Sequence, residues 1–303
     1  MAVTIFTHCK AFRGHIGIIQ RNAIGSWLQL GPECEVVLCG DRGGAAQTAE
    51  EFGLRHLAQV GQNEYGTPLV NDLFDRIQRI ASHDVLCYAN CDIIFLKDFV
   101  EAVEKVRSRL RRFLIVGECS NLDLTEPLAF EQPEWQTSLR EMIQHRGTPR
   151  GPRSIDYFIF SRGLYRNLPP FVFGTAYFDN WLIWKARALW AAAVDATKAI
   201  TAVHQNHDYA HVPGGYLWTR QGEAAKRNLE LAGGLRHIYF TYDTTHRLDS
   251  SGLRRNYGGL FRLKYRWEYE IMDWRIVQLT RPIRHLLGLR KATLERLSGL
   301  GSR

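Results

Sequence analysis

The stretch that most constrains the fold is VLCYANCDIIFL, residues 85–96. It consists of an apolar run, the polar triplet Asn90-Cys91-Asp92, and a second apolar run. Short apolar runs rich in β-branched and aromatic residues are typical of strands buried on both faces of a parallel sheet. Because open α/β sheets bind ligands at the carboxyl ends of their strands, we expect the functional site at this triplet.

The triplet has the chemistry of a cation site. Asn90 and Asp92 are two residues apart, so on an extended chain their side chains point the same way, while Cys91 points into the opposite layer. Two such oxygen-bearing side chains suit a hard divalent cation that also binds diphosphate and water. The alternative is an Asx turn that merely ends the strand.

Strands and helices alternate before this stretch. The pattern predicts strands at 3–7, 35–39 and 54–60, and helices at 18–30, 45–52 and 69–82. Such alternation implies right-handed crossovers and a mostly parallel sheet flanked by helices. Neither a GxGxxG motif nor a Walker lysine loop is present, so dinucleotide binding and P-loop chemistry are poorly supported.

The later chain is less regular. The pattern predicts helices at 98–112, 139–145, 182–193 and 221–232, strands at 113–118, 154–161, 199–203 and 235–241, and a polar turn at 243–251. Residues 120–152 lose periodicity and contain four prolines. A long loop inside a compact domain is usually functional.

The order of these features resembles the nucleotide-diphospho-sugar transferases of the GT-A type. The resemblance rests on the first strand, a strand ended by Gly40-Asp41, a helix opened by Thr67-Pro68, and then YANCDIIF, and it covers residues 3–215. In that family a DxD motif at the end of a central strand binds the metal and the donor diphosphate. In this chain Asn90 replaces the first Asp, so only Asp92 matches a motif carboxylate.

The resemblance implies a role for each of several residues. It places the donor nucleotide sugar against Asn90 and Asp92. Thr7, Asp41 and Asn71 are further candidates for donor binding, and the alternative for Asp41 is a residue that only forms the turn after its strand. It places Mn²⁺ or Mg²⁺ on Asp92, with His204 or His207 completing the site.

For the acceptor, the resemblance points to the stretch GTAYFDNW, residues 174–181. Asp179 would take the proton from the attacking hydroxyl, and Asp156, Tyr177 and Trp181 would bind the acceptor. The alternative for Asp179 is a carboxylate that only caps a helix N-terminus.

Two other functions stay open. Three histidines lie within residues 204–211, and a zinc hydrolase built from His204, His207 and Asp208 is one alternative, although no HExxH motif is present. A noncatalytic nucleotide-sugar binder is the other, suggested by Asn90.

Charge and cysteine content indicate the compartment and the surfaces with which the protein interacts. The net charge of +8 arises in residues 254–303, which hold 12 Lys/Arg and 4 Asp/Glu. This tail is predicted to form helices at 265–279 and 282–297, packed on the sheet through Trp267, Ile271, Trp274 and Leu279 or docked on an anionic membrane surface. Six cysteines without metal-ligand spacing and no signal-peptide pattern predict a cytoplasmic protein, peripheral at the inner face of the membrane if the tail docks there.

These observations together predict a GT-A-like α/β glycosyltransferase. We expect a catalytic domain at 1–250, with a donor half at 1–119 and an acceptor half at 120–215, and a basic helical tail at 251–303. The reaction would move a sugar from a nucleotide-diphosphate sugar to a hydroxyl of a glycan or lipid-linked acceptor, in glycan, polysaccharide or glycolipid synthesis. Nucleic acid is not expected as a partner.

Overall fold

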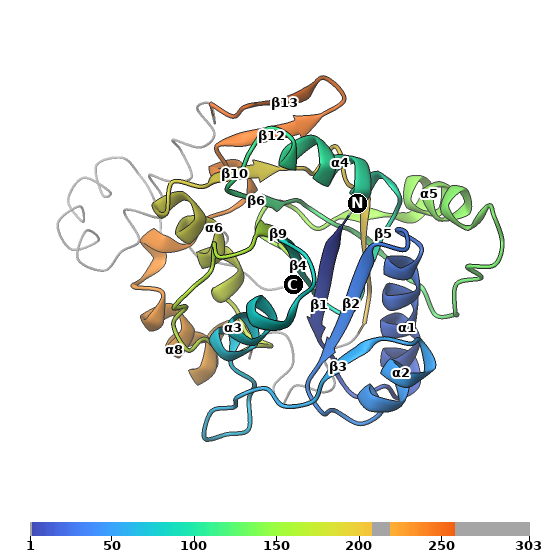
Figure 1. The fold of residues 1–303 in the computed structure, drawn as a ribbon, viewed down its shortest axis with the longest axis horizontal. Coiled ribbons are helices and arrows are strands. Elements are labelled where there is room, and N and C mark those ends of the chain that lie inside the picture. Colours follow the sequence, from blue (N-terminus) through green and yellow to red (C-terminus); the bar gives the residue numbers. More distant parts are fainter. Residues whose placement is uncertain (1, 208–218, 258–303) are drawn as a thin grey trace, which may run out of the picture.

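The fold is a mixed α/β structure built on two sheets (Figure 1). The computed structural model describes residues 2–207 and 219–257. The strands are β1 (Val3–His8), β2 (Cys34–Cys39), β3 (Arg55–Leu57), β4 (Val85–Ala89), β5 (Ile93–Phe95), β6 (Phe113–Val116), β7 (Ser120–Leu122), β8 (Thr148–Pro149), β9 (Tyr157–Ser161), β10 (Ala192–Asp195), β11 (Ala202–Gln205), β12 (His246–Asp249) and β13 (Gly252–Arg255). The helices are α1 (Gly14–Leu28), α2 (Ala45–Glu51), α3 (Val70–Ile80), α4 (Asp98–Arg107), α5 (Trp135–Arg146), α6 (Phe178–Ala188) and α8 (Glu223–Leu231), with 3-10 turns η1 (Leu235–His237) and η2 (Thr241–Asp243).

The larger sheet is mostly parallel, as the alternating pattern predicted. Its strand order is β13-β12-β10-β6-β9-β4-β1-β2-β3. Strands β12, β10 and β6 run parallel to one another, and so do β4, β1, β2 and β3. Strand β9 lies between these two groups and is antiparallel to both β4 and β6, and β13 is antiparallel to β12. The expected α/β class with helices on a mostly parallel sheet is therefore confirmed.

Strand β4 shows why the sheet is buried on both faces. Leu86 and Tyr88 pack into one hydrophobic cluster, while Val85, Cys87 and Ala89 pack into another. Successive side chains on a strand point to opposite faces, so both faces of β4 need an apolar cover. Helices α3 and α6 supply it on one side, and α1 and α4 on the other (Figure 1).

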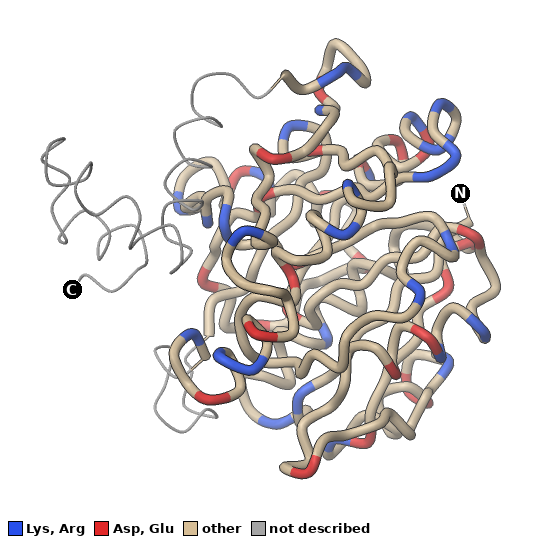
Figure 2. The backbone as a smooth tube through the Cα atoms, turned by 90° about the vertical axis from the view of Figure 1, so that its left-hand side faces the viewer, with Lys and Arg blue, Asp and Glu red and all other residues tan. Residues whose placement is uncertain are grey.

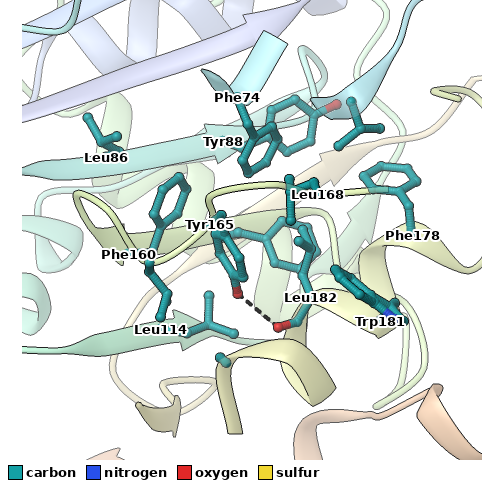
Figure 3. Packing of buried hydrophobic residues seen from close by; sticks show 14 of the residues in the cluster. Phe74, Leu86, Tyr88, Leu114, Phe160, Tyr165, Leu168, Phe178, Trp181 and Leu182 are labelled. Carbon is teal, nitrogen blue, oxygen red and sulfur yellow. Dashed lines mark hydrogen bonds between the residues drawn. The ribbon is translucent and has the colours of Figure 1, made fainter. Parts of the chain in front are cut away.

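The cluster under α3 and α6 is rich in aromatic rings (Figure 3). Phe74 stacks on Phe160 at a ring-centroid distance of 5.6 Å, and Tyr165 meets both edge-on. The Tyr165 hydroxyl donates a 2.9 Å hydrogen bond to the backbone oxygen of Leu182, so this buried polar atom is satisfied. These contacts anchor α6, whose first turn carries Asp179.

The chain leaves the larger sheet immediately after β4. Strand β5 belongs to a second sheet of order β5-β11-β7-β8, which has its own small core beneath α5. The core of this sheet includes Ile94, Trp135, Leu139 and Val203. The triplet at 90–92 is therefore the junction between the two sheets.

Three local predictions of secondary structure were wrong. The predicted helix at 182–193 ends at Ala188, and Ala192–Asp195 forms β10 because it pairs with β6. The predicted strand at 235–241 forms 3-10 turns instead, and the predicted polar turn at 243–251 contains β12, which pairs with β10. For β10 and β12, pairing within the sheet overrode the local pattern.

The boundary expected at residue 250 falls inside a β-hairpin. Strand β13 pairs with β12, so residues 252–255 are part of the larger sheet. The tail helices predicted at 265–279 and 282–297 lie outside the described residues. Within the described ranges, no helix has both the length and the apolar character needed to cross a membrane, and basic and acidic residues are interspersed along the chain (Figure 2).

Candidate metal and donor site

The junction between the sheets brings Asp92 and His204 together. Antiparallel pairing of β5 with β11 sets His204 opposite Ile93. The backbone N–H of Gln205 donates a 3.1 Å hydrogen bond to the backbone oxygen of Asp92. Backbone pairing therefore fixes two side chains that are 112 positions apart in the sequence.

Asp92, His204 and His207 form a compact cluster, with one ligand atom from each lying within 4.8 Å of the others. Oδ2 of Asp92 is 3.2 Å from Nε2 of His207 and 3.9 Å from Nε2 of His204. Asp92 is 8% exposed and His204 is 6% exposed. Among the described residues, Oδ1 of Asp92 is buried and has no hydrogen-bond partner. A buried carboxylate oxygen without a partner is costly, and a cation would satisfy it.

The electrostatics of the cluster favour an ionised carboxylate beside a neutral imidazole. Burial acts to raise the pKa of Asp92, but His204, His207 and Lys10 together hold that pKa well below its usual range. Burial lowers the pKa of His204, against the opposing pull of the Asp92 and Asp156 carboxylates. A carboxylate and a neutral imidazole are the protonation states that bind a divalent cation.

A second layer of polar residues orients His204. Its Nδ1 is 3.0 Å from Oδ1 of Asn121 and 2.9 Å from a guanidinium nitrogen of Arg150. Asn121 is the partner of His204 in the β7–β11 pairing, and Arg150 follows β8. Because Nδ1 is occupied on this side, Nε2 is the atom that faces Asp92.

The side chain of Asn90 is hydrogen-bonded to Asp156 and Tyr88. Its side-chain amide donates a 3.1 Å hydrogen bond to Oδ1 of Asp156, and Oδ2 of that carboxylate is 2.9 Å from Nε of Arg150. The Tyr88 hydroxyl donates to Oδ1 of Asn90 at 3.2 Å. Asn90 therefore belongs to the polar network around the Asp156–Arg150 ion pair, and the cluster holds one motif carboxylate.

Lys10 adds a positive charge next to His207. Its Nζ is 3.2 Å from Nε2 of His207. The side chain of Gln20 accepts a 2.7 Å hydrogen bond from the Lys10 backbone N–H and donates a 3.0 Å bond to its carbonyl. Gly17 allows this loop to lie against α1, because a Cβ there would be 3.0 Å from the carbonyl carbon of Phe12.

A cavity of about 480 Å³ adjoins the cluster at His207. Its other lining residues come from the start of α1, the segment after β7 and the end of β11, and they are Arg13, His15, Ile16, Asp123 and Asn206. The first turn of α1 contains no acidic residue, and a helix N-terminus favours anions. The cavity is therefore lined by one residue of the metal cluster, by the first turn of α1 with Arg13 and His15, and by the carboxylate of Asp123.

Asp179 lies in the first turn of α6 and accepts a 2.8 Å hydrogen bond from the backbone N–H of Asn180. Burial raises the pKa of Asp179 to about 6, and the nearby Asp156 carboxylate acts in the same direction. A partly buried carboxyl with a pKa near neutrality is suited to accept a proton.

The structure corrects the prediction for Trp181. Its side chain is 4% exposed and packs against Phe171 and Trp184 in the core, so it has no free face for an acceptor. Tyr177 is only partly buried and precedes α6 with a φ of 87°. Asp156 is held by Asn90 and Arg150, as described above, and its acceptor role stays a prediction.

The remaining predicted donor residues surround the carboxyl ends of neighbouring strands. Thr7 is buried in β1, Asp41 is exposed just after β2, and Asn71 lies in the first turn of α3. In the described part of the chain, the hydrogen bonds and ion pairs within the cluster involve none of the three. Their role stays a prediction.

Sequence reasoning missed Lys10, Asn121 and Arg150. Lys10 follows the first strand, where a basic loop residue was visible but unassigned. Asn121 and Arg150 lie in the aperiodic region, and only the pairing of β7 with β8 and β11 shows that they meet. Asp208, a ligand in the hydrolase alternative, lies outside the described residues.

Comparison with known proteins gives weak likenesses. No protein-family model matches the sequence, and no curated protein matches it significantly. Among solved structures, glucosyl-3-phosphoglycerate synthase from Mycobacterium tuberculosis with Mg²⁺ and UDP is 17% identical, with a TM-score of 0.45 over 77% of this chain and 80% of that one. The same synthase with Mn²⁺, UDP and glucosyl-3-phosphoglycerate is 13% identical, with a TM-score of 0.43 over 77% and 80%.

S. aureus TarS 1-349 is 12% identical, with a TM-score of 0.42 over 68% of this chain. The aligned part spans 58% of that TarS chain. At identities below 25% and TM-scores below 0.5, these solved structures carry no argument about the activity of this chain, which rests on the geometry of its own site.

Proposed function

We propose that this protein is a glycosyltransferase that uses a nucleotide-diphosphate sugar and a divalent cation. The observation that carries the proposal is the cluster of Asp92, His204 and His207 at the carboxyl end of β4. It adjoins a cavity that the N-terminal turn of α1 also lines. A bound cation and the N–H groups of a helix N-terminus both favour the negatively charged oxygens of a diphosphate.

The donor set fits a metal and favours Mn²⁺ over Mg²⁺. Imidazole nitrogens suit transition metals, whereas Mg²⁺ prefers oxygen ligands and water. We assign the Asp92 carboxylate and Nε2 of His204 and of His207 as the ligands. When bound, the metal would neutralise charge on the departing nucleoside diphosphate.

The other residues have supporting roles in the proposal. Asn121 and Arg150 keep the His204 ring oriented, and Asn90 holds Asp156 in place. Asp179 accepts the proton of the attacking acceptor hydroxyl, a role supported by its raised pKa.

The acceptor is proposed to be a glycan or a lipid-linked molecule. Such an acceptor would suit a protein held at an anionic membrane surface by the basic segment that begins at Arg254. Binding to vesicles with and without anionic lipid tests this part independently of the donor site.

The donor site is tested by thermal unfolding with a panel of nucleoside diphosphates and nucleotide sugars, each with and without Mn²⁺. A ligand at a hundred times its dissociation constant stabilises a protein by about 2.7 kcal/mol, so the stabilisation by a nucleotide that binds is readily measured. We expect one nucleotide to stabilise the protein in a Mn²⁺-dependent way and Asp92→Asn to remove that dependence.

Two outcomes would contradict the proposal. Stabilisation by Zn²⁺ alone, with no response to any nucleotide, would favour the hydrolase. Nucleotide-sugar binding without any turnover of the sugar would favour the noncatalytic binder.

A further inference from the structure

We propose that the Lys10 ammonium is a fixed positive charge of the donor site with two roles. It competes with the metal for His207, and it binds the donor diphosphate when no metal is present. The inference rests on the proposed function for its diphosphate part. The competition between Lys10 and a divalent cation for His207 does not depend on the proposed function.

The position of Lys10 is fixed by the fold. Lys10 follows β1 closely, and both polar groups of its backbone are held by the side chain of Gln20 at 2.7 and 3.0 Å. Gln20 is 2% exposed and lies on the 15-residue helix α1. A surface lysine is usually free to move, whereas this one starts from an anchored backbone and reaches inward to His207.

Nε2 of His207 is the atom for which Lys10 and a metal would compete. This nitrogen is 3.2 Å from Nζ of Lys10 and 3.2 Å from Oδ2 of Asp92. An imidazole nitrogen offers either one lone pair or one hydrogen. If its lone pair accepts from the ammonium, it is not available to a metal, so a metal can bind His207 only after Lys10 withdraws.

The role of the Lys10 ammonium follows from the charged groups around the cluster. Asp92 is the one motif carboxylate, and the neighbouring Asp156 is already paired with Arg150 at 2.9 Å. The Lys10 ammonium therefore adds a positive charge close to the Asp92 carboxylate, since both lie 3.2 Å from Nε2 of His207. An ammonium carries three N–H donors and no acceptor, so after leaving His207 it can donate to a phosphate oxygen in the adjoining cavity.

The competition is tested by titrating the protein with Mn²⁺ alone, using wild type, Lys10→Met and Lys10→Arg. We expect Lys10→Met to bind Mn²⁺ about tenfold more tightly, because a competing positive charge is removed. Lys10→Arg should stay close to wild type. Lys105→Met is the matched control, since Lys105 is an exposed residue of α4 paired with Glu101, and its Mn²⁺ affinity should not change.

The diphosphate part is tested with inorganic pyrophosphate in EDTA, which needs no knowledge of the base. Wild type and Lys10→Arg should bind pyrophosphate, and Lys10→Met should bind it at least about tenfold more weakly. Thermal unfolding without ligand shows whether each variant is folded.

The outcomes separate this inference from the proposed function. Equal Mn²⁺ affinity in wild type and Lys10→Met would overturn the competition. Equal metal-free pyrophosphate affinity in the two would overturn the diphosphate role. If no nucleoside diphosphate binds wild type with or without Mn²⁺, the proposed function fails together with the diphosphate role, and the Mn²⁺ titration still decides whether Lys10 competes.

Discussion

Replacing Asp179 with asparagine should make the protein more stable and less active. The folded-state pKa of Asp179 is about 6 because burial disfavours its ionised form, whereas an ordinary Asp has a pKa of 3.8. The folded state therefore loses stability as the pH rises from below 4 to above 6, since the unfolded chain ionises first. The amide of the substituted side chain would keep an oxygen for the N–H of Asn180 and would carry no charge.

The magnitude follows from the two pKa values. They differ by about 2, and each pKa unit corresponds to about 1.4 kcal/mol, so the full effect is about 3 kcal/mol. Asp179 is only partly buried, and water reduces the effect. We therefore expect Asp179→Asn to raise the free energy of unfolding by about 1–3 kcal/mol at pH 8 and to leave it nearly unchanged at pH 4.

Urea unfolding at the two pH values measures this difference. Glu64→Gln is the matched control because it neutralises an exposed carboxylate outside the site. A gain from Asp179→Asn that is the same at pH 4 and pH 8 would refute the burial argument.

Turnover of the same variant tests the assignment of Asp179 as the base. In wild type, the rate should rise as the pH increases through about 6, because the ionised carboxylate is the active form. Asp179→Asn should lower turnover by about 10²–10⁴-fold with nearly unchanged donor binding. Unchanged turnover would remove the catalytic role, and a collapse of donor affinity would indicate a structural or donor-binding one.

Three further substitutions test other parts of the structure. Asn90→Asp would set a second carboxylate against Asp156, so thermal unfolding should show a loss of about 1–3 kcal/mol; a gain in stability would contradict the geometry. Tyr165→Phe removes a hydroxyl donor to the backbone oxygen of Leu182 in α6 and should cost about 1 kcal/mol in urea unfolding, and no loss would mean that the bond is not formed. Trp27→Phe removes a 2.9 Å indole hydrogen bond to a backbone oxygen of β5 as well as buried volume, so about 2–3 kcal/mol should be lost; a change below about 0.5 kcal/mol would show that this contact does not hold β5 against α1.

The sequence predicted the first half of the fold well because its signals are local. Buried strands such as β4 appear as apolar runs, and short turns separate them from the helices. The same signals failed for β10 and β12, which are short and depend on neighbours in the sheet. Whether a residue such as Ala192 lies in a strand is decided by its partner, and a single sequence does not show the partner.

The site was predictable in its chemistry more than in its geometry. Asp92 and His204 have residue types that suggest a metal, and a motif order suggested that they belong together. The contacts of Asp156 with Asn90 and with Arg150 depend on the start of β9 and the end of β8 lying close together. The burial of Trp181 depends on which side of α6 faces the sheet, and its neighbours in the sequence do not decide that.

The location of the site at the junction of two sheets has a consequence for local stability. Asp92 follows a strand of the larger sheet, whereas His204 belongs to the smaller sheet. One face of the smaller sheet packs into a cluster of the larger sheet through Ile93, Phe95 and Ala202, and the other face packs on a core of its own beneath α5. Separate cores often open as separate cooperative units. A ligand that bridges Asp92 and His204 would couple the two units, and it should slow amide hydrogen exchange in β11 and β7 well beyond the residues that it touches.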